Sequence, residues 1–338
     1  MKKNRVVLLE ALLLVLALCL GGCGGKEEGK TLSLTNVSYD PTRELYTEYN
    51  ALFTAGWEKT GGKPLTITQS HGGSGSQAIS VSQGLEADVV TLALEADIRA
   101  IEKAGLIREG WRGELPKDSA PYTSTIVFLV RRGNPKGILD WPDLAREGVG
   151  VITPNPKTSG GARWNFLAAW AYAQETLGGG EEACRDFVGA IFRNVLVLDS
   201  GARGSTTSFV ENGQGDVLIA WENEAMLTLQ QHPGEYEMVA PSISILCQPS
   251  VAVVDEVVDK RGTREMATAY LEGLYAPETQ RLVARYFYRP SDPDILQEFA
   301  DSFDLSIRMT NIDHFGGWGQ AQQRFFADGG VFDQIYEK

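Results

Sequence analysis

The chain has 338 residues, of which 43% are apolar and 22% are charged, and its formal net charge at pH 7 is −13. This composition excludes a disordered chain and a small disulfide-stapled protein, and the length suits about two ordinary domains. The acidic balance also argues against a nucleic-acid-binding protein, because such a surface needs Lys and Arg to neutralise phosphates.

The first residues have the pattern of a secretory signal. A basic start over residues 1–5 precedes an apolar run at 11–20 and two glycines. A membrane-spanning helix needs about 20 apolar residues, so the pattern predicts a signal peptide over residues 1–22. Leu20-Gly21-Gly22-Cys23 resembles the lipobox of bacterial lipoproteins, which implies cleavage before Cys23 and lipidation of its thiol. Residues 23–30 then predict a lipid-anchored flexible tether, so we expect an exported protein on the outer side of the cytoplasmic membrane.

Only two cysteines, Cys184 and Cys247, remain for the folded part of the protein. Two cysteines cannot build a metal cluster. An oxidising compartment permits a disulfide between them, but their spacing does not distinguish a disulfide from two buried thiols.

The sequence after the tether alternates short apolar strands with helical patterns, and the same rhythm returns in its middle part. This alternation predicts parallel sheets with helices on both faces. The predicted strands are 31–37, 64–68, 87–92, 149–153, 195–198 and 217–220, and predicted helices start near 40, 76, 159 and 200.

Two β-rich stretches, 123–130 and 243–254, separate the two series and are predicted to be crossover strands. We therefore predict an α/β protein of two lobes, each a mostly parallel sheet flanked by helices. Because two crossings return the chain to its first lobe, residues 31–123 and 250–338 are predicted to form lobe I. Residues 124–249 are predicted to form lobe II.

Four predicted loops share one design, in which a strand ends in small or capping residues and a helix begins. A helix start exposes unpaired N–H groups and about half a positive charge, and glycine lets an anion approach the backbone. In open α/β sheets such starts lie at the carboxyl ends of the strands, where ligands bind. The four loops, which could converge on one cleft, are Asp40-Pro41, His71–Gly75, Ser159–Ala162 and Ser200–Ser205.

Seven long motifs resemble the bacterial extracytoplasmic sulfate-binding proteins of ABC transporters. The resemblance covers about residues 32–335 and implies a two-lobed periplasmic-binding fold (type II) that closes on one sulfate. The motifs are Asn36–Leu45, Gln69–Gly75, Glu86–Leu92, Ala120–Ile126, Thr153–Trp164, Asp199–Ser205 and Ala220–Glu224.

The resemblance also implies which groups hold the anion, all of them uncharged donors. They are the backbone N–H groups of Asp40, Ser74, Gly160 or Gly161, and Ala202, the Ser159 hydroxyl and the Trp221 indole N–H. Sulfate is fully deprotonated at neutral pH and only accepts hydrogen bonds, so a pocket of donors suits it. Hydrogen phosphate carries a proton that would lack an acceptor there, at a cost of about 1–3 kcal/mol.

Three charged residues adjoin these loops. We assign the Asp40 carboxylate to capping its own helix. The guanidinium groups of Arg163 and Arg203 suit direct contact with a dianion, but the resemblance argues against this and implies supporting roles. In such roles the arginines neutralise carboxylates such as Asp40, Asp88 or Asp199, or brace the loops.

The resemblance further implies a permease with its ATPase as partners, and we expect a monomer. We expect neither cofactor nor metal, because the chain has no nucleotide-binding G-x-x-x-x-G-K-[ST] loop, H-E-x-x-H motif or EF-hand pattern. Two alternatives remain, namely a thiosulfate-binding protein of the same transporter family, and a serine hydrolase or sulfoesterase that uses Ser74 or Ser159. The enzyme alternative lacks a G-x-S-x-G elbow and a base grouped with an orienting acid.

Overall fold

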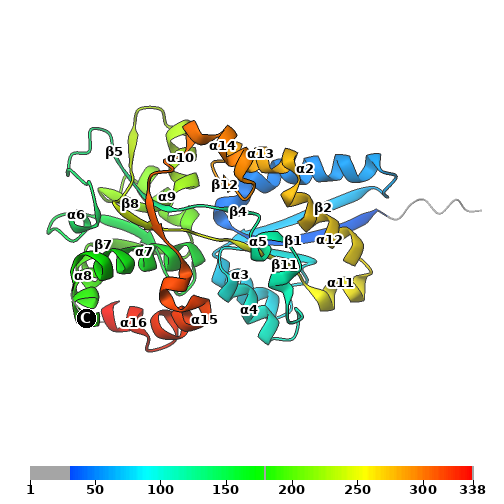
Figure 1. Ribbon diagram of the computed structural model, residues 1–338, viewed down its shortest axis with the longest axis horizontal. Helices are drawn as coiled ribbons and strands as arrows, with labels where there is room; N and C mark the ends of the chain where they lie inside the picture. Colours follow the sequence, from blue (N-terminus) through cyan, green and yellow to red (C-terminus); the bar gives the residue numbers. More distant parts are fainter. Residues whose placement is uncertain (1–30, 179, 337–338) are drawn as a thin grey trace, which may run out of the picture.

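The computed structural model describes residues 31–178 and 180–336 and consists of two lobes side by side (Figure 1). The predicted signal peptide, lipobox and tether lie outside these residues. In the part of the chain described, no helix is long and apolar enough to cross a bilayer.

Lobe I is built on a four-stranded sheet with the strand order β11-β3-β1-β2. Strand β1 (Leu32–Tyr39) pairs in parallel with β2 (Leu65–Gly72) and β3 (Val89–Leu92), and β11 (Ser250–Val253) is antiparallel to β3. All four residues of β3 are buried, as expected for a central strand covered on both faces. The helices of this lobe are α2 (Arg43–Lys59), α3 (Ser74–Ser82), α4 (Glu95–Lys103), α5 (Pro116–Ser119), α11 (Asp255–Arg261), α12 (Arg264–Glu272), α13 (Pro277–Arg285) and α14 (Pro293–Glu298), with the short turns η1 (Asp40–Thr42), η2 (Trp111–Gly113), η3 (Gly273–Tyr275) and η4 (Ala300–Ser302).

Lobe II is built on a five-stranded sheet with the strand order β7-β6-β8-β5-β9. Strands β6 (Val151–Pro154), β7 (Val195–Asp199) and β8 (Val217–Trp221) are mutually parallel, and β5 (Ile126–Arg131) is antiparallel to its neighbours β8 and β9 (Tyr236–Val239). The helices are α6 (Trp141–Leu144), α7 (Gly160–Thr176), α8 (Glu181–Arg193), α9 (Ala202–Val210) and α10 (Glu222–Gln231). The α/β, mostly parallel architecture predicted from the sequence is confirmed.

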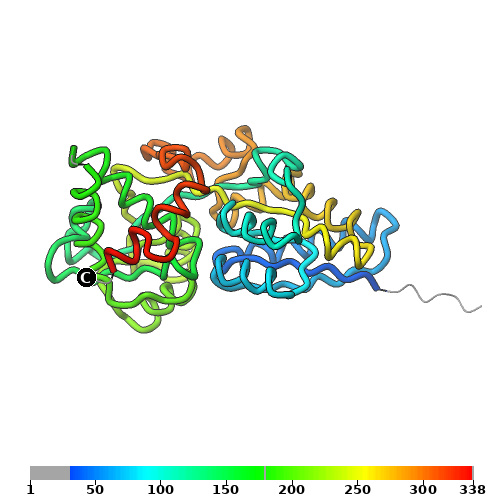
Figure 2. The backbone as a smooth tube through the Cα atoms, turned by 90° about the horizontal axis from the view of Figure 1, so that it is seen from below, coloured from blue at the N-terminus to red at the C-terminus, as the bar shows by residue number. Residues whose placement is uncertain are grey.

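The chain passes between the lobes along extended segments, and the tube in Figure 2 shows these passages near the middle of the molecule. Strand β4 (Tyr122–Thr123), which pairs with β12 (Arg289–Pro290), leads into β5. Strand β10 (Ile243–Ile245) leads back and pairs in parallel with β13 (Arg308–Thr310) of a third passage near the C-terminus. The sequence predicted only the first two passages.

The C-terminal segment corrects the predicted lobe boundaries. After β13 it forms η5 (Ile312–Phe315), α15 (Gly317–Ala321), η6 (Gln322–Phe326) and α16 (Val331–Tyr336), and α16 lies beside α8 of lobe II (Figure 1). The ring centroids of Phe325 and Trp170 are 5.0 Å apart, and Phe332 lies 5.5 Å from Phe192. The prediction that all residues after 250 return to lobe I is therefore wrong for the last part of the chain, because an aromatic face on α7 and α8 binds it.

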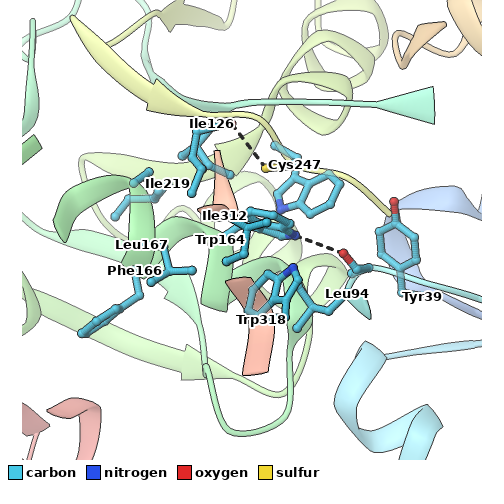
Figure 3. Close-up of a cluster of buried hydrophobic side chains, with 14 of the residues drawn as sticks. Tyr39, Leu94, Ile126, Trp164, Phe166, Leu167, Ile219, Cys247, Ile312 and Trp318 are labelled. Carbon is cyan, nitrogen blue, oxygen red and sulfur yellow. Dashed lines mark hydrogen bonds between the residues drawn. The ribbon is translucent and has the colours of Figure 1, made fainter. Parts of the chain in front are cut away.

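One hydrophobic cluster runs through both lobes, which are in contact in this structure. Figure 3 shows Trp164 and Trp318 beside Leu94 of lobe I. The indole N–H of Trp164, on α7 of lobe II, donates to the carbonyl of Ala93 in lobe I at 3.0 Å. The structure therefore represents a closed arrangement of the lobes.

Cys184 and Cys247 do not form a disulfide in this structure, since both are buried free thiols.

Candidate anion-binding site

The strand register brings the predicted loops together. In lobe I, Tyr39 at the end of β1 lies opposite Gly72 at the end of β2, so the helical turns that follow them start side by side. In lobe II, Pro154 at the end of β6 lies opposite Asp199 at the end of β7. Trp221 ends β8, which is parallel to β6. The carboxyl ends of the strands of both lobes therefore meet at the cleft, as the rule for open α/β sheets predicts.

Helix starts from both lobes surround a small cavity, of about 10 Å³. Helices α3, α7 and α9 and the turn η1 all begin there, and the first N–H groups of an α-helix have no partner within the helix. Their N-terminal partial charges favour an anion at the same point. The cavity is lined by Tyr39, Asp40, Pro41, Gly72, Gly73, Ser74, Ser159, Gly161 and Ala202.

A second cavity, also of about 10 Å³, adjoins the first on the side of lobe II and shares Gly161 and Ala202 with it. Trp221 lines this second cavity. Gly160 lines neither, but a Cβ added to it would lie 3.0 Å from the Ser74 Cβ across the cleft. The structure thus brings together the seven residues predicted from the sequence as anion ligands, Asp40, Ser74, Ser159, Gly160, Gly161, Ala202 and Trp221.

Two predicted side-chain donors have protons to offer at this point. The Ser159 hydroxyl oxygen caps α7 by accepting from the Ala162 N–H at 3.3 Å, which leaves its proton free to bind a ligand. The Trp221 indole N–H has one long hydrogen bond, of 3.4 Å, to the Gly161 carbonyl. The Trp221 ring is also held in place by Tyr39, whose ring centroid is 5.5 Å away.

The Ser74 hydroxyl, in contrast, is committed to the protein. It donates to the Asp97 carboxylate at 2.6 Å and accepts from the Ala93 N–H at 3.0 Å. Its backbone N–H, at the start of α3, is the group that remains for an anion. A hydroxyl bound to a buried carboxylate, with no histidine among its partners, lacks the arrangement of an activated nucleophile.

Asp40 does not cap its own helix, so that prediction is wrong. Neither η1 nor α2 has a side-chain cap. The carboxylate instead reaches across the cleft to the start of α9, next to Gly201 and Arg203, and one of its oxygens is 3.7 Å from Arg43. Burial raises the pKa of Asp40, while Arg43 and Arg203 act in the opposite direction. In the closed state the carboxylate therefore lies between Arg43 of its own lobe and the start of α9 in lobe II.

The two arginines neutralise carboxylates, as expected, but not the predicted ones. Arg163 pairs with Asp97 at 2.9 Å in a buried ion pair that crosses the cleft. Arg203 pairs with Glu44 at 2.5 Å, also across the cleft. Neither arginine lines the two cavities.

His71 has a structural role next to the site. Its Nδ1 lies 3.2 Å from the Tyr39 carbonyl, and burial lowers the pKa of His71 to about 4. The ring is therefore neutral at physiological pH and adds no positive charge to the cavity.

The sequence did not identify three features of the site. Gly73 and Gly201 face each other across the cleft, and a Cβ on Gly201 would collide with the Asp40 carboxylate. Glu224 lines the second cavity three residues after Trp221. Acidic residues in a first helical turn are common for structural reasons, so no sequence signal separates Glu224 from an ordinary residue of a helix start.

Two lobes that close over a small cavity of hydrogen-bond donors define a solute-binding protein of the type II periplasmic-binding fold. The chain belongs to the family of bacterial extracellular solute-binding proteins, whose model matches residues 34–289. The resemblance and fold inferred from the sequence are thereby confirmed. The expectation of a binding protein rather than an enzyme is confirmed as well, because the family binds solutes.

Two individual relatives show which solute-binding proteins this chain is similar to. The chain is 57% identical over 311 residues to the sulfate-binding protein of Salmonella typhimurium, which covers 91% of this chain and 94% of the relative. It is 46% identical over 331 residues to the thiosulfate-binding protein of Pseudomonas aeruginosa, which covers 97% and 98%.

The solved structure of the sulfate-binding protein SubI from Mycobacterium tuberculosis H37Rv is similar, with a TM-score of 0.79 and 33% identity over 87% of this chain and 99% of that one. The periplasmic binding protein AfuA from Actinobacillus pleuropneumoniae, with a TM-score of 0.66 and 17% identity over 86% and 96%, shares the fold.

Proposed function

We propose that this protein captures sulfate in the cavity between its lobes and delivers it to an ABC importer. The observation that carries the proposal is the convergence of three helix starts, the Ser159 hydroxyl and the Trp221 indole on two adjoining cavities that no arginine or lysine of the described residues lines. Backbone and indole N–H groups only donate, and sulfate only accepts. The names of the relatives that are 57% and 33% identical support the same ligand.

The proposed ligands are the N–H groups of Asp40, Ser74, Gly160, Gly161 and Ala202, the Ser159 hydroxyl and the Trp221 indole N–H. Arg163 and Arg203 support the site from behind, through the ion pairs with Asp97 and Glu44. Hydrogen phosphate would bring a proton into this ring of donors, where it would meet another donor rather than an acceptor. We therefore expect sulfate to be preferred over phosphate.

Calorimetric titration with sulfate, thiosulfate, molybdate and phosphate at pH 7 tests this function. We expect one sulfate to bind per chain, released heat to saturate, and phosphate to leave the sulfate titration unchanged. Thiosulfate belongs in the series because one relative, 46% identical, is a thiosulfate-binding protein. Equal competition by phosphate would contradict the selection by donors.

The transport partners and the membrane attachment are part of the proposal. We propose that a permease with its ATPase receives the sulfate, that the protein acts as a monomer, and that lipidated Cys23 holds it at the outer side of the cytoplasmic membrane. The lipobox at residues 20–23 supports the anchor. Mass spectrometry of the protein extracted from its host membrane should find a diacylglyceryl-sized mass on Cys23, and a Cys23→Ala variant should lose it.

A further inference from the structure

Glu224 is a carboxylate in an unexpected place. It lies in the first turn of α10, directly after β8, and it is 8% exposed. Its neighbours in the lining of the second cavity include three of the proposed sulfate ligands, Gly161, Ala202 and Trp221. An ionised carboxylate in the lining of this cavity would repel a bound dianion, because buried like charges interact strongly.

The Glu224 carboxylate also differs from the other acidic groups nearby in having no partner. Within the described part of the chain, the hydrogen bond found for Glu224 is made by its backbone carbonyl, which accepts from the Thr228 hydroxyl, and none is found for its carboxylate. Glu222, two positions earlier on the same helix, is held by two hydrogen bonds from Arg289, at 2.7 and 2.8 Å. The nearest cation, Arg203, is bound to Glu44. A buried acidic group without a partner is more stable in its neutral form.

The surroundings of Glu224 favour the same protonation state. Burial is the main cause that raises the pKa of Glu224, to about 8, with further contributions from Asp40 on η1 and Glu44 on α2. Arg203 on α9 acts in the opposite direction. The pKa of Tyr288, which follows α13, lies well above its usual value, mainly because the phenol is buried. The charge of Glu224 raises the pKa of Tyr288 further.

We propose that Glu224 is a proton-linked determinant of anion affinity, and that the closed site holds a divalent oxyanion only while this carboxyl group is neutral. The inference rests on the proposed function, because it concerns the same cavity. Glu224 is not one of the expected hydrogen-bond donors. It affects sulfate binding because its carboxyl group must be uncharged when the anion binds.

The sign of the linkage follows from the charges. A bound dianion disfavours the ionised form of Glu224, so ligand binding raises its pKa further. The affinity for sulfate is then constant at pH values below the pKa of Glu224 in the ligand-free protein. Above that pKa, the affinity falls by up to about tenfold per pH unit. Each sulfate that binds well above that pKa is accompanied by the uptake of about one proton. Sulfate itself does not titrate there, so any change belongs to the protein.

The histidine and the two tyrosines next to the cavity do not titrate in the same range. The pKa of His71 is lowered to about 4 by burial, so its ring stays neutral. The pKa values of Tyr39 and Tyr288 are raised well above 10 by burial, so both phenols stay protonated. A fall in sulfate affinity between pH 7 and 9.5 that is absent from Glu224→Gln therefore reports on Glu224.

The test is a calorimetric titration of the full-length protein with sulfate at fixed ionic strength from pH 6.5 to 9.5. The native protein should bind at least tenfold more weakly at pH 9.5 than at pH 7, whereas Glu224→Gln, which keeps the shape without the charge, should bind equally at both. Glu235→Gln, an exposed change in the same lobe, should keep the native pH dependence. A flat profile for the native protein, or the same fall in Glu224→Gln, would overturn the inference.

A second measurement decides the matter if Glu224→Gln does not fold. The native protein, titrated at pH 8.5 in buffers of different ionisation enthalpy, should take up about three quarters of a proton per sulfate, and an uptake near zero would overturn the inference. The two proposals fail differently. Folded protein that binds no sulfate at pH 6.5 contradicts the proposed function, while sulfate binding without proton uptake contradicts only the role of Glu224.

Discussion

Trp221 combines full burial with an indole N–H that is only weakly used, since its hydrogen bond to the Gly161 carbonyl is 3.4 Å long. Trp221→Phe removes this donor and keeps much of the ring that packs on Tyr39. We expect sulfate binding to weaken by about 1.5–3 kcal/mol, the range for a hydrogen bond to a charged group. Calorimetry measures the effect, and Trp57→Phe, the same chemical change on α2, serves as the control. Native affinity in Trp221→Phe would remove the indole from the site.

Ser159 and Ser74 provide a matched pair, because both line the same cavity but only one hydroxyl is free to donate. Ser159→Ala should weaken sulfate binding and, through loss of the α7 cap, lower the free energy of unfolding by about 0.5–2 kcal/mol. Ser74→Ala leaves Asp97 without one donor, so we expect it to lower stability while the Ser74 backbone N–H still binds.

Urea unfolding without ligand and titration with sulfate separate the two effects. The expectation fails if Ser74→Ala loses more affinity than Ser159→Ala.

At the scale of elements, α7 must begin with a residue that has no side chain, at Gly160. A Cβ on Gly160 would lie 2.9 Å from the Ala93 Cβ and 3.0 Å from the Ser74 Cβ, both in lobe I. Gly160→Ala should therefore weaken sulfate binding while lobe II keeps its stability, because alanine favours a helix by up to about 1 kcal/mol.

Gly189→Ala, in the middle of α8, is the matched control. Its Cβ would make only ordinary contacts, 3.5 Å from Arg193 and 3.7 Å from Ile335, so sulfate affinity should stay native and thermal stability should rise. Native sulfate affinity in Gly160→Ala would show that the turn tolerates a side chain.

The elements also show how far the sequence can predict this site. The four loops could be placed because Ser, Asp and Gly at a strand-to-helix junction have a local physical meaning. Contacts across the cleft leave no such local pattern. The Asp40 carboxylate lies against the start of α9, and the C-terminal aromatic residues pack on α7 and α8, so the partners of these groups are distant in sequence. Glu224 was missed for the same reason, since its environment exists only in the folded protein.

At the scale of the whole molecule, closure depends on two glycines that face each other. A Cβ on Gly73 would lie 2.7 Å from the Thr158 and Ser200 carbonyl oxygens, and a Cβ on Gly201 would collide with Asp40. Both glycines have negative φ angles, −61° and −157°, which alanine adopts without strain. Gly73→Ala and Gly201→Ala should therefore fold normally but remain open.

Small-angle X-ray scattering can measure this closure. We expect sulfate to reduce the radius of gyration of the native protein and to leave that of both variants nearly unchanged. Native-like contraction of either variant would contradict a steric requirement at the cleft.

The use of main-chain amides as ligands has a consequence for how such a protein evolves. Every residue except proline carries the same amide, so most replacements at Asp40, Ser74 or Ala202 leave the hydrogen-bonding group in place. Selectivity is then inherited with the path of the backbone rather than with the identity of individual side chains. Adaptation to a different oxyanion would have to proceed through shifts in loop geometry or in the few side chains, such as Trp221, that offer the bound ion a chemistry of their own.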